Sequence, residues 1–257
     1  MALAYTIKGN GAVVLWLHGL ALDGTMWDEF THNFASKYKH LCIDMPGFGK
    51  SAKLPAPENL EDIARSIKAL LDELGVAQVS VVGHSMGGYV ALALMELYPG
   101  LVTRLCMFHS QPFADDVPKK ADRKKLITFI EKNGTAAWMK DFYMGLFAEE
   151  NRDKLSGTIK LLFDQGIQID QNNVINTIKA LINRSDRAAV LEQFKGPVLF
   201  IVGNEDAAIS SKNSLAQLDI PDISFVEMLD GVAHMGIFEA PAETKKAIEE
   251  LLDYPID

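Results

Sequence analysis

The sequence predicts an α/β protein built on a doubly wound, mostly parallel sheet of about seven to eight strands. Short, continuously apolar segments alternate along the chain with longer amphipathic ones. Continuously apolar strands are typical of a sheet that helices cover on both faces. The alternation breaks once, between residues 117 and 194, where helical patterns follow one another without a strand. These observations predict one α/β core that carries a helical insertion.

The predicted elements follow from local apolar patterns. The strand-like segments cover residues 13–18, 41–44, 79–82, 101–108, 198–202 and 223–228. The helical patterns cover residues 26–34, 60–74, 86–97 and 242–252. Gly75 ends the second of these helices, and Pro99 with Gly100 ends the third, because these residue types favour helix termination.

Residues 117–194 predict a helical lid on the same domain. This segment contains amphipathic runs such as KKADRKKLITFIEKN and TAAWMKDFYMGLF. No flexible Gly/Ser linker flanks it, so we expect it to cap the core and not to form a separate domain. The core then comprises residues 1–116 and 195–257.

Composition and charge exclude several kinds of partner. The chain has 257 residues, of which 48% are hydrophobic and 23% charged, with a formal charge of −9 and an isoelectric point of about 5.2. Nucleic acids and anionic membranes attract basic surfaces, so neither is an expected partner. No apolar run approaches the ~18 residues of a membrane-spanning helix. We expect a cytoplasmic protein, either a monomer or a homodimer.

The two cysteines predict neither a disulfide nor a metal site. Cys42 and Cys106 each lie inside an apolar, strand-like run and outside any CxxC or Cys/His spacing. We interpret both as buried free thiols, which fits a reducing compartment. No cofactor and no metal is expected.

The segment VVGHSMGGYVALAL, residues 81–94, carries the main functional signal. A strand runs into Gly83 and a helix starts at Met86, so the chain must reverse direction around Ser85. Glycines two residues before and two residues after the serine leave room for the helix to fold back on its own strand. A serine that only caps a helix would not require glycine on both sides. We therefore interpret Ser85 as a nucleophile above the carboxyl edge of the sheet.

A serine nucleophile needs a general base, and His234 is the candidate among the six histidines. It lies in LDGVAHMGIFEAP, between the last strand and the last helix, at the same sheet edge as Ser85. His84 is adjacent to the serine and should point away from it, and His18 should shape the loop after its strand. His109 ends a strand near the site, where a role in the pocket and a structural role both stay open.

The base needs an orienting acid, which VLFIVGNEDAAIS supplies after a buried strand. Asp206 is the candidate, and Glu205 is the neighbour that could take its place. Asp230 lies only four residues before His234 and fits a turn better. The resulting order along the chain is serine, aspartate, histidine.

An acyl-transfer site also needs N–H donors for the oxyanion. WLHGLALDG follows a strand, and the flexible backbone at Gly19 lets the amide of Leu20 face the site. The second expected donor is the amide of Met86, at the positive N-terminal end of its helix. An ordinary strand-to-helix loop is the alternative for this segment.

Together these segments resemble the α/β-hydrolase superfamily. The matching motifs are LHG (17–19), DMPGFGKS (44–51), GHSMGG (83–88), GNED (203–206) and His234. The resemblance covers nearly the whole chain and implies that the insertion is the lid that follows the family's sixth strand. It also implies a nucleophile, an acid, a base, two oxyanion donors and a structural aspartate at Ser85, Asp206, His234, Leu20, Met86 and Asp44.

Three details refine the resemblance. Only residues 4–7 precede the LHG strand, so the family's first edge strand is expected to be absent, which leaves about seven strands. The family often has a proline shortly after the acid, whereas AAIS follows Asp206. Related enzymes that act on haloalkanes or epoxides carry aspartate at the nucleophile position, so Ser85 favours acyl chemistry.

Aromatic and methionine side chains cluster in the predicted lid. Helical spacing assigns most of them to the lid's own core, and some should face Ser85 as an apolar acyl pocket. The pocket candidates are His109, Phe113, Trp138 and Phe142. The Lys and Arg residues in 119–125 are expected to form a solvated face, and no basic clamp for a carboxylate or phosphate is evident. A small or medium apolar ester is the expected substrate.

The sequence thus predicts a serine hydrolase of carboxylic esters, thioesters or lactones that works through an acyl-enzyme on Ser85. Two alternatives stay open. The same residues would serve a C–C bond hydrolase or a perhydrolase. A ligand-binding, receptor-like protein with slow turnover is the alternative from a different class.

Overall fold

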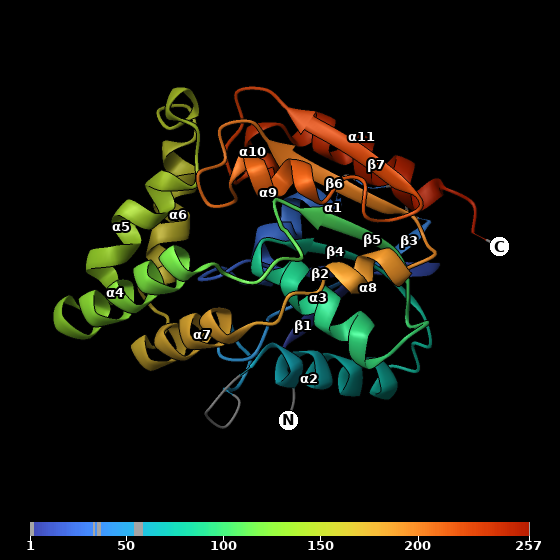
Figure 1. The fold of residues 1–257 in the computed structure, drawn as a ribbon, viewed down its shortest axis with the longest axis horizontal. Helices are drawn as coiled ribbons and strands as arrows, with labels where there is room; N and C mark the ends of the chain where they lie inside the picture. The colour runs from blue at the N-terminus through green and yellow to red at the C-terminus, as the bar shows by residue number, and fades with distance from the viewer. Residues whose placement is uncertain (1–2, 33, 35–36, 54–58, 257) are drawn as a thin grey trace.

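The sheet is seven-stranded in the computed structural model, which describes residues 3–32, 34, 37–53 and 59–256. The strand order is β1-β3-β2-β4-β5-β6-β7 (Figure 1). β1 (Tyr5–Gly9) lies at one edge and pairs with β3 (Tyr38–Ile43) in the antiparallel direction. The remaining pairings are parallel. The prediction of a mostly parallel sheet with about seven strands is confirmed.

The parallel strands bring their carboxyl ends to one edge of the sheet. Besides β3 they are β2 (Ala12–Leu17), β4 (Val79–His84), β5 (Val102–Phe108), β6 (Val198–Gly203) and β7 (Ser224–Leu229). The strand order reverses between β2 and β4, since β3 lies on one side of β2 and β5 on the far side of β4. Ligands of open α/β sheets bind at such a reversal, beyond the carboxyl ends of the strands.

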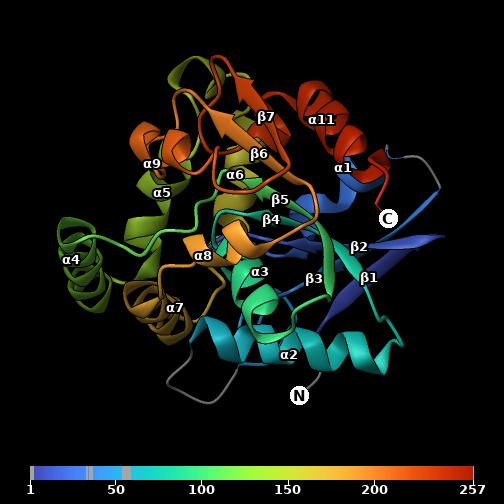
Figure 2. The same ribbon diagram turned by 45° about the vertical axis from the view of Figure 1, so that its right-hand side comes forward.

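Helices cover both faces of the sheet, because side chains alternate between the two faces along each strand. On β2, Val14 and Trp16 join one hydrophobic cluster, whereas Leu15 and Leu17 join the other. The first cluster includes residues of α1 (Asp28–His32) and α11 (Pro241–Asp253). The second includes residues of α2 (Leu60–Glu73), α3 (Met86–Leu97) and α8 (Ala188–Gln193). Figure 2 shows the two groups on opposite sides of the sheet, which confirms the doubly wound arrangement.

The segment between β5 and β6 contains only helices as regular elements. They are α4 (Val117–Asn133), α5 (Thr135–Gly145), the 3₁₀ helix η2 (Glu149–Asn151), α6 (Ser156–Gly166), α7 (Gln171–Asn183) and α8. α4 contacts α5 and α7, and α5 contacts α6. These four helices gather beyond the arrowheads of the strands at the left of Figure 1, whereas α8 packs on α3.

Two elements differ from their predicted bounds by more than two residues or in kind. β3 begins at Tyr38 and not at residue 41, because residues 38–40 already pair with β2, and Tyr38 and His40 are buried there. Trp16 Nε1 donates a hydrogen bond to His40 Nδ1 at 3.1 Å, which satisfies a buried polar pair inside the core. The predicted helix at 26–34 is divided into the 3₁₀ helix η1 (Gly24–Trp27) and α1, and residue 33 lies outside the described residues.

Neither a membrane span nor a disulfide appears in the described part of the chain. None of its helices is long and apolar enough to cross a bilayer. Cys42 and Cys106 are buried free thiols, as the sequence predicts. Burial raises the pKa of the Cys42 thiol to about 12, so this cysteine is a poor nucleophile.

Candidate active site

Ser85 stands at the sharp turn between β4 and α3, with backbone angles of φ 51° and ψ −113°. Such angles are uncommon for a residue other than glycine and mark a strained position. A Cβ at Gly83 would lie 2.6 Å from Gly88 N, and one at Gly87 would lie 2.7 Å from Leu17 C. Both glycines are therefore required for α3 to pack against its own strand and against β2. The turn leaves Ser85 half-buried at the carboxyl edge of the sheet.

Hydrogen bonds to main-chain atoms of Ser85 hold this turn in place. Ser85 N donates to Phe108 O at 2.9 Å, which ties the turn to the end of β5. Ser110 Oγ donates to Ser85 O at 2.7 Å. Neither bond uses the Ser85 hydroxyl, so the side chain remains available to a ligand.

His234 and Asp206 form a buried hydrogen-bonded pair. His234 Nδ1 lies 2.7 Å from Asp206 Oδ2, and the two side chains are only 4% and 3% exposed. The other carboxylate oxygen, Oδ1, accepts from the N–H groups of Ala208 and Ile209 at 2.8 and 3.1 Å. The sequence-predicted base and acid are thus in direct contact.

The ionisation of Asp206 decides the proton position on His234. Burial alone would raise the pKa of the Asp206 carboxyl, but the charge of His234 and hydrogen bonds from His109 and His234 outweigh it, so this pKa lies far below its usual value. An ionised carboxylate only accepts hydrogen bonds, so His234 must carry its proton on Nδ1. Nε2 is then left as a proton acceptor.

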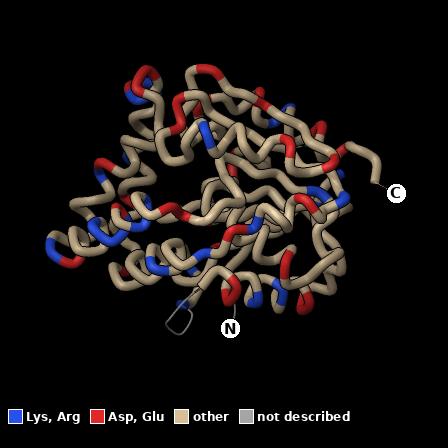
Figure 3. Tube along the Cα trace, viewed as in Figure 1, with Lys and Arg blue, Asp and Glu red and all other residues tan. Residues whose placement is uncertain are grey.

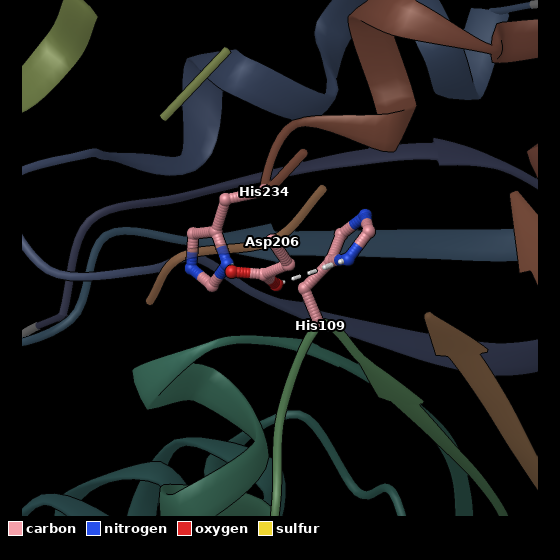
Figure 4. A group of neighbouring side chains, drawn as sticks. All are labelled: His109, Asp206 and His234. Atoms are coloured by element: carbon pink, nitrogen blue, oxygen red, sulfur yellow. Dashed lines mark hydrogen bonds and ion pairs between the residues drawn. The ribbon is translucent and has the colours of Figure 1, made fainter. Parts of the chain in front are cut away.

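His109 lies on the far side of the same carboxylate (Figure 4). Its Nδ1 is 3.5 Å from Asp206 Oδ2, and the N–H groups of Gly203 and Gly236 approach Nδ1 and Nε2 at 3.3 and 3.1 Å. A neutral imidazole accepts at one nitrogen only, and the carboxylate favours the tautomer with the proton on Nδ1. His109 has a φ of 46°, an uncommon value for a residue other than glycine, and its ring faces Asp206.

Two further histidines brace the loops around the site. His84 Nε2 donates to His234 O at 2.9 Å, so the residue before Ser85 supports the backbone of the predicted base. His18 Nε2 accepts from Met45 N at 2.8 Å, and its Nδ1 lies 2.8 Å from Gly19 O. His18 therefore shapes the loop at Gly19, as expected. The bracing role of His84 had no sequence signal, because it depends on a loop 150 residues away.

A cavity of about 320 Å³ opens at Ser85 and His234. Leu20 and Met86, the predicted oxyanion donors, line it together with Phe142 from α5. The helical segment between β5 and β6 contacts the predicted base directly, because His234 N donates to Leu146 O at 2.9 Å. The structure thus brings the predicted nucleophile, base and donors to one cavity, with the acid behind the base.

Three predicted pocket residues are not among the residues that line this cavity. His109 instead faces Asp206. Phe113 lies where its carbonyl accepts two hydrogen bonds from Arg184, at 3.2 and 3.0 Å. Trp138 lies behind Phe142, with ring centroids 4.4 Å apart. Residues 119–125 are also not wholly a solvated face, since Lys119 and Arg123 line the cavity.

A larger hollow of about 860 Å³ lies at the opposite edge of the sheet. Its lining includes Val102, Pro197 and Ile223, at or just before the starts of β5, β6 and β7. Neither Ser85 nor His234 lines it. The smaller cavity is therefore the candidate active site.

His109, Asp206 and His234 also form a group of potential metal ligands, with donor atoms within 4.8 Å of one another. Both imidazoles direct Nδ1 at the same oxygen of Asp206, at 2.7 and 3.5 Å. A metal ion bound there would coordinate the Nδ1 atoms and would displace the protons that these atoms donate to Asp206. The donor arrangement fits a hydrogen-bonded network better than a coordination shell.

The chain belongs to the α/β-hydrolase fold family, whose family model matches residues 12–241. A solved esterase from Thermogutta terrifontis superposes with a TM-score of 0.91 and 24% identity, over 97% of this chain and 92% of that one. The enol-lactonase from Burkholderia xenovorans gives a TM-score of 0.90 and 19% identity, over 98% and 94%.

A curated relative has a different named activity. The 2-hydroxy-6-oxononadienedioate/2-hydroxy-6-oxononatrienedioate hydrolase of a Pseudomonas species is 25% identical, over 83% of this chain and 79% of its own length. Family and relatives together identify the protein as a hydrolase.

Proposed function

We propose that the protein is a serine hydrolase that cleaves a carboxylic ester through an acyl-enzyme on Ser85. The observation that carries the proposal is the cavity shared by Ser85 and His234, with Asp206 bonded to His234 at 2.7 Å. A nucleophile, a base and an orienting acid in this relation are the groups that acyl transfer requires.

In the first step, His234 Nε2 takes the Ser85 hydroxyl proton while the serine oxygen attacks the ester carbonyl. The proton on Nδ1 stays bonded to Asp206, which stabilises the imidazolium that forms. His234 then returns its proton to the leaving alcohol. The acyl group remains on Ser85 as an ester.

The negative oxygen of the tetrahedral intermediate would be held by the backbone N–H groups of Leu20 and Met86. Met86 is the first residue of α3, where N–H groups lack partners within the helix and the helix dipole is positive. Each donor would contribute about 3 kcal/mol to transition-state stabilisation. In the last step, His234 activates a water molecule that hydrolyses the acyl-enzyme.

Intact-mass labelling with a fluorophosphonate, together with p-nitrophenyl esters of graded chain length, tests this proposal. We expect one label per chain and ester turnover in the wild type, and neither in Ser85→Ala. The melting temperature should hardly change, because the hydrogen bonds of the turn use main-chain atoms of Ser85. Ser66→Ala, on α2, is the matched control and should keep both properties. Wild-type turnover in Ser85→Ala would exclude this nucleophile.

A second candidate function is hydrolysis of a C–C bond next to a ketone, supported by the named activity of the Pseudomonas relative. The same three residues would serve it, and a panel of lactones, thioesters and vinylogous diketones would distinguish these reactions. Labelling of Ser85 without turnover of any panel member would support the receptor-like alternative.

A further inference from the structure

Two basic residues of α4 line the candidate active-site cavity, although α4 looks like a solvated helix in the sequence. Lys119 and Arg123 are four residues apart, so they project from the same face of the helix. α4 carries more basic than acidic residues, as the blue segments at the left of Figure 3 show. The face with Lys119 and Arg123 is directed at the cavity that also contains Ser85.

The positive charge of Arg123 is not fully matched by its acidic partner. Arg123 Nε bonds to Asp115 Oδ2 at 2.6 Å, and the Arg123 side chain is 14% exposed. The other oxygen of Asp115 already pairs with Arg184 Nη1 at 2.7 Å, and both of these side chains are almost fully buried. One carboxylate thus serves two guanidinium groups, which leaves an excess of one positive charge beside the cavity.

Lys119 adds a second cation. Its ammonium group donates to the carbonyl oxygen of Ala208 at 3.3 Å, on the loop that follows Asp206. A carbonyl accepts a hydrogen bond but does not neutralise the charge. Burial, reinforced by the neighbouring charge of Arg123, lowers the pKa of Lys119, although part of the side chain reaches solvent. An anion bound beside it would reverse this effect.

The acidic residues near the cavity offset only part of this charge. Asp141 on α5 is an acidic residue of the lining, and it is exposed. Asp206 does not line the cavity, and its carboxylate is turned toward His234 and His109. Among the residues that the structure describes, the charged side chains in the lining are Lys119, Arg123 and Asp141, with a formal net charge of +1 when the histidines are counted as neutral.

We propose that Lys119 and Arg123 form a subsite for a carboxylate of the substrate, so that the enzyme prefers an anionic ester such as a half-ester of a dicarboxylic acid. This inference rests on the proposed ester hydrolysis at Ser85. The planar guanidinium of Arg123 has further N–H groups that suit a carboxylate, and the ammonium of Lys119 supplies a point charge. The Arg123 side chain is mostly buried, so water screens its interaction with an anion less than it would screen that of a fully exposed side chain.

A binding experiment separates the subsite from the chemistry. In the Ser85→Ala background, calorimetry compares monomethyl adipate with methyl hexanoate, which matches its acyl length without the charge. We expect the half-ester to bind about tenfold more tightly, and Lys119→Met or Arg123→Met to abolish the difference. Lys124→Met, on the same helix but outside the cavity lining, is the matched control and should preserve it.

Further variants exclude a merely structural effect. Arg123→Lys keeps the charge and should retain most of the preference, whereas Asp141→Asn should strengthen binding of the half-ester by removing repulsion. Added salt should reduce the preference for the half-ester more than the affinity for the neutral ester. A second pair, 6-acetoxyhexanoate and hexyl acetate, shows whether the carboxylate is recognised on the alcohol side instead.

The outcomes of the two proposals are distinguishable. Equal affinity for the charged and neutral members of both pairs overturns the subsite, whether or not the wild type hydrolyses esters. A preference that Lys119→Met and Arg123→Met leave intact also overturns it. Absence of turnover on every ester in the wild type overturns the hydrolase proposal alone, because the affinities are measured without turnover.

Discussion

Replacing Asp206 with asparagine should disable His234 by reversing its tautomer. Asp206 Oδ1 accepts two backbone N–H groups, from Ala208 and Ile209, whereas Oδ2 faces His234 Nδ1. In Asp206→Asn the amide oxygen takes the position with the two donors, which leaves the NH₂ group facing His234. That NH₂ group can only donate, so Nδ1 must become the acceptor and Nε2 must carry the proton.

The size of the effect follows from the loss of the base. With a proton on Nε2, His234 cannot accept the proton of Ser85, so kcat/KM should fall about 10⁴-fold, or about 5.4 kcal/mol in activation free energy. The variant is nearly isosteric, so its melting temperature reports separately on folding. The assay is initial-rate hydrolysis of a p-nitrophenyl ester at neutral pH, corrected for spontaneous hydrolysis.

Two controls address the alternative acids. Glu205→Gln and Asp230→Asn should each stay within about threefold of wild type, because both side chains lie on the surface and neither is hydrogen-bonded to His234. Glu205 is exposed, and Asp230 accepts a hydrogen bond from Asn204 Nδ2 at 3.1 Å, on the surface. The tautomer argument is refuted if Asp206→Asn keeps more than a tenth of wild-type activity, or if Glu205→Gln shows the larger loss.

Two further predictions concern stability. Gly87→Ala should lower the unfolding free energy by about 2 kcal/mol, because its Cβ would lie 2.7 Å from Leu17 C. The control Gly157→Ala has open space at the Cβ and should not destabilise the protein. Thermal melts of both variants check this, and an unchanged melting temperature in Gly87→Ala would contradict the steric argument. Burial lowers the pKa of His40 to about 4, so the unfolded chain binds more protons between about pH 6.5 and 4 and stability should fall as the pH drops through this range. His40→Gln, which can still accept from Trp16 Nε1, should flatten this part of the pH dependence in denaturant titrations, and an identical slope would argue against His40 as its source.

The fold and the position of the site were predictable because both depend on local patterns and on chain direction. Buried apolar runs predict parallel strands, and parallel strands end at one edge, so residues just after β4, β6 and β7 must meet there. Predicting Ser85 and Asp206 at this edge required only the direction of the strands and the glycines of the turn. Predicting His234 as the base required only its position between the last strand and the last helix.

The supporting histidines could not be assigned from the sequence. His84 bonds to the backbone of His234, and His109 faces Asp206, across 150 and 97 residues of chain. No local pattern encodes such contacts, because they depend on how separate loops pack at the sheet edge. The positive φ of His109 also has no signal in a non-glycine residue.

The sequence by itself determined the sheet, the sharp turn at Ser85 and the order of the candidate catalytic residues, since these follow from hydrophobic periodicity, steric space at glycine and strand direction. Only the tertiary structure decided which face of α4 and α5 meets the cavity. Amphipathic spacing distinguishes a buried helix face from an exposed one, but the wall of a cavity is neither. The sequence therefore assigned Lys119 and Arg123 to a solvated face, and it could not tell that Phe142 lines the cavity whereas Trp138 does not. The packing of α4 against α5 and α7 sets that orientation, and with it the charged side chains that line the cavity.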